Sequence, residues 1–167
     1  GNLLDLLDSR YTYLNGPLAT HYGISGVTGN AMRRVSLSDR QRGGLLGMGA
    51  VHAATSTPQR SSPVVRGVWV LQTLLGESVP DAPADAGALP GNAGTRPGMT
   101  LRDELVEHRR NAKCAICHAK MDPLGFGLQN FDAIGRFRTH QAGKKIDSVG
   151  ILPDGSRFSG PAELKAY

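Results

Sequence analysis

The sequence is poor in aromatic residues, in cysteine and in long apolar runs, and each shortage limits what the protein can be. Phe, Trp and Tyr make up 5% of the 167 residues, although hydrophobic residues reach 40%. A core of Leu, Val, Ala and Ile is thin for this length, and an apolar cofactor would supply the missing mass. No apolar run reaches the ~18 residues of a membrane helix, so we expect no membrane span.

The length and the first residue indicate what kind of chain this is. A chain of 167 residues has the size of one domain, or of one domain with an extension. It begins with Gly rather than Met and shows no signal peptide, so we expect a fragment of a longer, processed protein. The 22 glycines and 10 prolines predict much irregular chain.

The charge is basic, with a net +5 and a pI near 9.6. The basic residues are scattered, and the only doublets are Arg33-Arg34, Arg109-Arg110 and Lys144-Lys145. Few aromatic residues lie between them to stack on bases, so we expect no nucleic-acid partner. We interpret the charge as ordinary solubility, although it also favours anionic partners.

The two cysteines of the chain, Cys114 and Cys117, precede His118 in a C-x-x-C-H box. This spacing is the attachment signature of a c-type haem. Two thiols one helical turn apart can add to the vinyl groups at one haem edge, and the adjacent His becomes the proximal iron ligand. The alternatives are a disulfide, a redox pair and half of a zinc site. A zinc site needs four ligands, and no second cysteine pair exists.

The residues after the box are expected to support the proximal histidine. The second ring nitrogen of a metal-bound His donates to a carbonyl or a similar group. Pro123 and Leu124 follow shortly after the box, and we expect them to supply that carbonyl and to pack beneath the ring. Asp122 is expected to cap the next turn, at residues 124–125, beyond a short box helix that ends before Pro123.

The sixth iron ligand is expected from the Gly-rich stretch 40–57. Met48 lies there between Gly47 and Gly49, in an apolar setting that suits a thioether ligand and allows close approach of a flat group. His52 is four residues further on and would share a helix face with Met48. The alternatives to Met48 are His52, His21, Met99 and an open position. Met121 is discounted because it leaves the box helix on the proximal side.

Hydrophobic spacing and turn signals predict a mainly α fold. It would be a small, c-type cytochrome-like helical domain with long irregular loops and a small C-terminal β-hairpin. Helical spacing of Leu3, Leu4, Leu7 and Tyr11 predicts a first helix. Further predicted elements are a helix opened by Pro17, a strand over 33–37, a helix over 64–75 with Trp69 in the core, a helix capped by Thr100, a hairpin turning at Asp154-Gly155, and a last helix from Pro161.

We expect one haem-binding domain over residues 1–167, in two parts. Residues 1–77 form a helical part that supplies the distal wall of the haem pocket. Residues 78–98 form a loop rich in Pro, Gly and Ala. Residues 99–167 carry the C-x-x-C-H box and the hairpin. A haem needs cover on both faces, so the two parts are not expected to be independent.

Three stretches resemble a known group of domains. Residues 40–76, 101–138 and 146–164 look like the C-terminal domains of large exported planctomycete-type cytochrome proteins, and CHAKMDPLGFG and FDAIGRFR are the most specific stretches. Those domains are catalogued as being of unknown function. The resemblance implies export and one covalent haem on Cys114, Cys117 and His118, and it implies no established reaction or substrate.

These patterns favour a haem-c electron-transfer domain of a larger periplasmic or otherwise extracytoplasmic protein. Its partners would be a redox protein or other domains of the parent chain, and no catalytic residue is required. One alternative is a haem enzyme, then an oxidoreductase, or a gas sensor, with an open distal site lined by His52 or Arg60. A second alternative is an interaction module of an extracytoplasmic assembly, with haem as a structural element.

Overall fold

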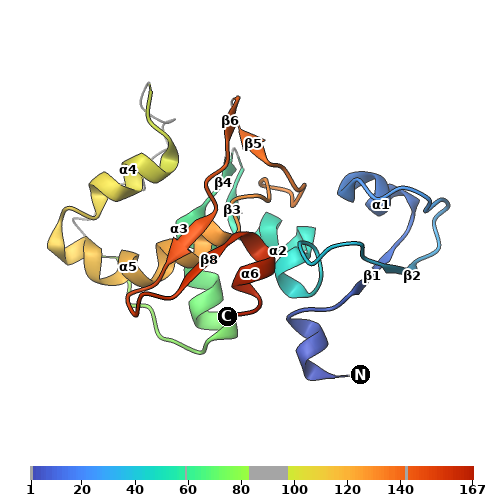
Figure 1. Ribbon diagram of the computed structural model, residues 1–167, viewed down its shortest axis with the longest axis horizontal. Helices are drawn as coiled ribbons and strands as arrows, with labels where there is room; N and C mark the ends of the chain where they lie inside the picture. Colours follow the sequence, from blue (N-terminus) through green and yellow to red (C-terminus); the bar gives the residue numbers. More distant parts are fainter. Residues whose placement is uncertain (1, 59, 83–97, 142) are drawn as a thin grey trace.

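The computed structural model describes residues 2–58, 60–82, 98–141 and 143–167. Short elements with long connections follow one another along an elongated molecule, with α4 at one end and β1, β2 and α1 at the other (Figure 1). The helices are η1 (Leu3–Leu6), α1 (Gly16–Tyr22), η2 (Leu45–Gly47), α2 (Gly49–Ala54), α3 (Pro63–Trp69), η3 (Val70–Leu74), α4 (Leu101–His108), α5 (Ala112–Gly127) and α6 (Gly160–Leu164). The strands are β1 (Tyr11–Leu14), β2 (Arg33–Ser36), β3 (Ser56–Thr57), β4 (Arg60–Ser61), β5 (His140–Gln141), β6 (Lys144–Lys145), β7 (Val149–Ile151) and β8 (Arg157–Ser159).

The predicted mainly α fold class is wrong. The structure has 41% helix and 16% strand, and its described part sets six α-helices beside four small antiparallel sheets of two strands each. Two of these sheets, β3–β4 and β5–β6, consist of two-residue strands. Strands this short carry no alternation of apolar and polar residues, which is the pattern by which a strand is recognised in a sequence.

The predicted first helix is also wrong beyond its first turn. The 3-10 helix η1 ends at Leu6, and Tyr11 begins strand β1, which pairs with β2 from Tyr11 opposite Ser36 to Leu14 opposite Arg33. Leu3 and Leu4 are 78% and 65% exposed, so no core covers the apolar stripe that suggested a longer helix. Most helical stability comes from packing of that stripe, and here the packing is missing.

Local cap and turn signals predicted several elements correctly. The Asn15 side chain accepts from the Leu18 N–H at 3.0 Å at the start of α1, and Gly23 ends the helix with a φ of 71°. Strand β2 lies within the predicted range 33–37. Thr100 and Asp103 form a capping box at the start of α4. Hairpin β7–β8 and helix α6 follow at the predicted places.

The core lies between α3 and α5, which approach each other through glycines. A Cβ on Gly67 of α3 would lie 1.9 Å from the Met121 carbonyl oxygen, and one on Gly125 of α5 would lie 1.8 Å from the Pro63 carbonyl oxygen. Only glycine permits backbones to come this close. The packed residues around the contact are Leu46, Val64, Val70, Leu71, Leu105, Met121, Leu124, Phe126, Leu128, Phe158 and Leu164. Trp69 lies at the edge of this cluster, partly buried.

Replacing Gly67 with alanine should therefore separate the two central helices. We expect Gly67→Ala to lower the free energy of unfolding by about 3 kcal/mol, because the new methyl group overlaps the Met121 carbonyl. Urea unfolding followed by circular dichroism measures the change. Val65→Ala, on the exposed side of α3, is the control and should change stability by no more than about 1 kcal/mol. Equal midpoints for Gly67→Ala and wild type would contradict the close helix contact.

Helix α5 continues through Pro123, where the sequence predicted that it would end. Proline removes one helical hydrogen bond and crowds the preceding turn, at a cost of about 3 kcal/mol. Here Pro123, Leu124 and Phe126 are all buried against α3 and hairpin β7–β8. Burial of this half of α5 outweighs the proline penalty, so one helix joins the box to the core.

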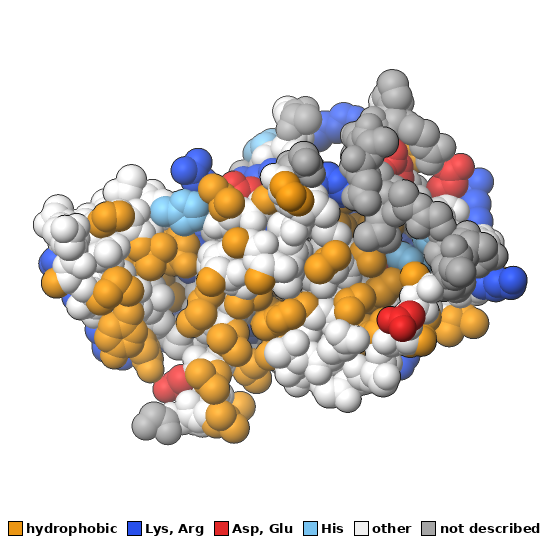
Figure 2. Space-filling view, turned by 180° about the vertical axis from the view of Figure 1, so that it is seen from behind, with side chains coloured by type: hydrophobic (Ala, Val, Ile, Leu, Met, Phe, Trp, Pro, Cys, Tyr) orange, Lys and Arg blue, Asp and Glu red, His pale blue; other side chains and the backbone are white. Residues whose placement is uncertain are grey.

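The C-terminal hairpin covers the buried half of α5. Phe158 of β8 is 1% exposed, and its ring fills the space that a side chain would take at Gly150 and Gly127. Elsewhere apolar side chains reach the surface, and Figure 2 shows them spread over the rear face in several groups.

Candidate functional site

Helix α5 carries all three residues of the C-x-x-C-H box in its first two turns. The Asn111 side chain accepts from the Lys113 N–H at 3.0 Å and so begins the helix directly before Cys114. Cys114 and Cys117 are both free thiols, and both are partly exposed. Ile116, between them, is 75% exposed. The box therefore begins at the surface, while Cys117 packs against the edge of the core.

The His118 ring is held by a carboxylate of its own helix. His118 Nδ1 donates to Asp122 Oδ1 at 2.9 Å, and Asp122 is fully buried one helical turn further on. A carboxylate that accepts a hydrogen bond from Nδ1 fixes the tautomer of the ring and leaves a free electron pair on Nε2. His118 is thus prepared to ligate a metal through Nε2.

The second oxygen of Asp122 faces an arginine. Arg109 Nε lies 3.7 Å from Asp122 Oδ2, and this buried oxygen has no hydrogen bond among the described residues. A buried carboxylate is costly unless cations or donors compensate it. His118 and Arg109 together provide that compensation, so the three side chains form one connected unit.

The ring of His108 lies against His118. The two ring centroids are 4.8 Å apart, with the rings inclined at 69°. His108 ends helix α4, and burial, followed by the nearby His118, lowers its pKa from the usual value. The side chain of His118 is 8% exposed, so a metal or cofactor that binds Nε2 has to displace some of the neighbouring side chains.

The proximal residues fit a covalently attached haem. The two thiols are unpaired, and they share a helix with His118. Asp122 holds the Nδ1 side of the His118 ring, which leaves Nε2 free to bind a metal. When bound, a haem supplies an iron that changes oxidation state. Among residues 2–58, 60–82, 98–141 and 143–167, no three His, Cys, Asp or Glu side chains converge to hold a bare metal ion.

Pro123 and Leu124 do not take the place predicted for them. The expected carbonyl partner of the His118 ring is replaced by the Asp122 carboxylate, and Asp122 lies within α5 rather than capping a later turn. Pro123 and Leu124 are buried on the same helix, where Leu124 belongs to the core. The signal for the true partner is the spacing of His118 and Asp122, because residues four apart face each other on a helix.

The Gly-rich stretch lies away from the box in this structure. Met48 is 43% exposed at the start of α2, and the next residue, Gly49, packs against Tyr22 and Ile134. Figure 1 shows α2 near the middle of the long axis and the first turns of α5 toward the α4 end. The structure thus brings His108, rather than Met48, next to His118, and Met48 as sixth ligand stays a prediction.

The other predicted ligands have neighbours of their own. His52 is fully buried, its Nε2 lies 2.9 Å from the Leu46 carbonyl oxygen, and its ring stacks on Phe131 at 4.1 Å. His21 Nε2 lies 2.8 Å from the Ile134 carbonyl oxygen. Met99 is half-buried just before the cap of α4. His52 and His21 thereby join the first part of the chain to residues 131–134.

The burial of His52 predicts acid instability. Burial, with Arg66 nearby, lowers the pKa of His52 from 6.5 to about 3. The unfolded chain therefore takes up a proton that the folded chain refuses between pH 6.5 and about 3. Stability should fall by about 1.4 kcal/mol per pH unit over this range as the pH is lowered. Below the pKa of His52 in the folded protein, this contribution to stability no longer changes with pH.

Urea unfolding between pH 7 and 4 measures this slope. In His52→Gln the part of the slope that belongs to His52 should vanish, while the contributions of other groups stay. The same slope in wild type and His52→Gln would show that His52 does not titrate as its burial requires.

The comparisons with known proteins place the chain in a family. Within the described part of the chain, no helix is long and apolar enough to cross a membrane. No curated protein and no solved structure matches the chain. Residues 42–141, which cover α2, α3, α4 and α5, match the family model PSCyt3, described as "Protein of unknown function (DUF1588)". That name refers to planctomycete-type cytochrome proteins, so the resemblance to domains of these proteins is confirmed by the family name. With 100 of its 167 residues matched, the chain belongs to the PSCyt3 family.

Proposed function

We propose that this chain is a c-type haem-binding electron-transfer domain of a larger exported protein. Cys114 and Cys117 hold one haem through thioether bonds, and His118 is the proximal ligand of its iron. The family name, which refers to cytochromes, supports the proposal. Covalent attachment requires reduced thiols and export, so the domain would function in the periplasm or another extracytoplasmic space.

The observation that carries the proposal is the contact between His118 and Asp122. A buried carboxylate at 2.9 Å from Nδ1 is the arrangement that orients a metal-ligating histidine and raises its basicity. A thiol redox pair needs no histidine with a fixed tautomer, whereas a metal ligand does. The contact explains why the box is followed by Asp122 on the same helix.

The residues of the chain then perform three tasks in electron transfer. The thiols of Cys114 and Cys117 fix the position of the haem edge on α5. Asp122 holds the His118 ring, and Arg109 balances the buried charge of Asp122. The α3–α5 packing keeps the helix in place while the iron changes oxidation state. The partners would be a redox protein or other domains of the parent chain.

A haem enzyme or gas sensor with an open iron site is the second candidate. The observation that favours it is the position of α2 away from the first turns of α5 (Figure 1), since Met48, the predicted sixth ligand, begins α2 and does not reach the box in this structure. A visible spectrum of the haem-loaded protein separates the two functions. Electron transfer predicts low-spin haem that does not bind carbon monoxide. High-spin haem that binds carbon monoxide would overturn it in favour of the enzyme or sensor.

The sixth ligand is tested by a single substitution. If Met48 closes the iron site, α2 has to approach His118 on attachment, and Met48→Ala should convert low-spin haem to high-spin haem. An unchanged spectrum rules Met48 out. His52→Gln is the companion variant, because His52 is the next candidate for the sixth position in the same stretch. A high-spin spectrum only in His52→Gln would assign the position to His52.

A further inference from the structure

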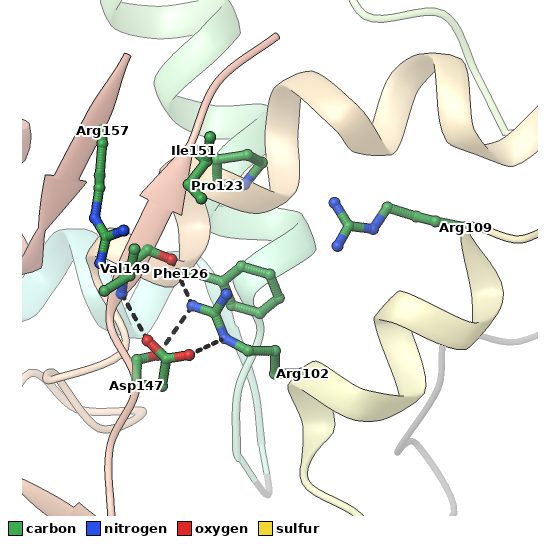
Figure 3. Close-up of a pocket in the computed structure, with 8 residues that line it drawn as sticks. All are labelled: Arg102, Arg109, Pro123, Phe126, Asp147, Val149, Ile151 and Arg157. Atoms are coloured by element: carbon green, nitrogen blue, oxygen red, sulfur yellow. Dashed lines mark hydrogen bonds and ion pairs between the residues drawn. The ribbon is translucent and has the colours of Figure 1, made fainter. Parts of the chain in front are cut away.

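A cleft of about 470 Å³ opens beside the box helix, between α5, the end of α4 and hairpin β7–β8 (Figure 3). Its size falls within the range of small-molecule sites in proteins. Its lining comes from the two segments that flank the box and from the hairpin, and it consists of Arg102, Arg109, Pro123, Phe126, Asp147, Val149, Ile151 and Arg157.

The charged groups of the cleft are three arginines and one aspartate. Arg102 is fixed in place, since its Nε lies 3.2 Å from Asp147 Oδ2 and it donates to the Val149 carbonyl at 2.6 Å. Arg157 is exposed on β8 and has no ion-pair partner among the described residues. Figure 3 shows Arg109 and Arg157 on opposite sides of the opening. The cleft therefore carries an excess of positive charge over the single carboxylate.

The rest of the cleft wall is apolar. The guanidinium carbon of Arg102 lies 3.8 Å from the centroid of the Phe126 ring, which holds the cation flat. Pro123, Val149 and Ile151 complete the wall. A small inorganic anion would leave this apolar surface uncovered. An organic carboxylate with an apolar body matches both the arginines and the apolar wall. Its carboxylate can pair with an arginine in a planar, forked geometry, and its body can cover the wall.

Arg109 joins this cleft to the box. Its Nε lies 3.7 Å from Asp122 Oδ2, and the other oxygen of Asp122 accepts from His118. Occupation of the cleft by an anion would draw Arg109 toward the anion and away from Asp122. The carboxylate would then interact more strongly with the His118 ring.

We propose that this cleft binds an organic carboxylate with an apolar body, paired with Arg109 over the Phe126 and Pro123 wall, while Arg157 adds positive charge on the opposite side of the opening. Two sources have this chemistry: the propionate groups of a haem attached to the box, and a free organic acid. The binding site itself rests on the cleft geometry, while the haem source and the link to His118 rest on the proposed function.

The experiment uses the haem-free chain and 2-naphthoate as the probe. Isothermal titration calorimetry should show saturable binding with a Kd of about 1 mM or tighter. Arg109→Gln should weaken binding about tenfold, because it loses a charge-assisted hydrogen bond, and Arg157→Gln should weaken binding by a smaller factor, because it removes a more distant positive charge. Arg110→Gln is the matched control, since Arg110 is exposed next to Arg109 and does not line the cleft. The neutral analogue 2-naphthalenemethanol should bind much more weakly.

The haem-loaded protein then distinguishes the two sources. Loss of naphthoate binding on loading assigns the cleft to the haem propionates, and retained binding assigns it to a free acid. A failure of haem attachment with naphthoate binding intact would remove the proposed function and leave the site. Absence of saturable binding, or equal weakening by Arg110→Gln and Arg157→Gln, would overturn the site. Chemical shift changes at His118 in the haem-free chain test the link through Arg109, and unchanged shifts on saturation would exclude it.

Discussion

Serine at both Cys114 and Cys117 is expected to abolish covalent haem attachment completely. The thioether bonds need sulfur, and the chain has no other cysteine to replace these two. Both thiols are free and partly exposed on α5, and serine is close to cysteine in size, so the helix should remain folded although Cys117 lies at the edge of the core. The measurement is haem staining of the denatured protein after expression with haem-attachment machinery, with circular dichroism to confirm that the variant is folded.

Ile116→Ser is the matched control for this result. Ile116 lies between the two cysteines and is 75% exposed, so its replacement changes the box without touching a proposed attachment residue. It should retain denaturation-resistant haem. Equal staining in the double serine variant and the wild type would show that haem is held elsewhere. Equal loss in Ile116→Ser would show that the assay reports disruption of the helix.

Among the substitutions proposed for this protein, Arg66→Met should cause the largest loss in the free energy of unfolding. Arg66 is 1% exposed on α3, and burial lowers its pKa to about 9. Its guanidinium donates to the carbonyls of Leu128, Phe131 and Asp132 at 2.7–3.0 Å. Methionine fills the space but removes all three hydrogen bonds, and the Leu128 and Asp132 carbonyls keep only the N–H groups of Phe131 and Gly135 as donors. Three lost hydrogen bonds to a charged group at about 1 kcal/mol or more each give an expected loss of at least about 3 kcal/mol.

Urea unfolding of the haem-free chain measures this loss. Arg66→Lys should be intermediate, because lysine keeps the charge and cannot reach all the acceptors of the guanidinium fork. Arg110→Met, at an exposed position, should change stability by no more than about 0.5 kcal/mol. A midpoint for Arg66→Met equal to that of Arg110→Met would contradict the assigned hydrogen bonds.

The elements that could be predicted from the sequence are those with local causes. The caps at Asn15 and Thr100 and the turn at Asp154-Gly155 involve residues within four positions of each other. The predictions of secondary structure were wrong where contacts between residues far apart in the sequence determine the structure. Strand β1 forms because β2 pairs with it some twenty residues later, and the leucines at helical spacing before it, Leu3 and Leu4, are exposed and pack on no core. Pro123 stays helical because α3 and the hairpin bury its turn.

The sequence locates the C-x-x-C-H box of the candidate site, but it does not show which side chains contact His118. The C-x-x-C-H spacing identifies Cys114, Cys117 and His118 without any structure. The Asp122 partner has a sequence signal in its spacing from His118, but a carboxylate before a proline also has the pattern of a cap. Buried arginines such as Arg66 have no signal, because arginine is usually exposed and its burial depends on carbonyls far along the chain.

The most direct test of the haem proposal is the mass of the tryptic peptide that contains both thiols. Cleavage after Lys113 and Lys120 releases CAICHAK, residues 114–120, from protein exported with haem-attachment machinery. The proposal predicts that this peptide carries the mass of one haem and absorbs in the visible region. A colourless peptide with two unmodified cysteines, or with a disulfide between Cys114 and Cys117, would contradict it.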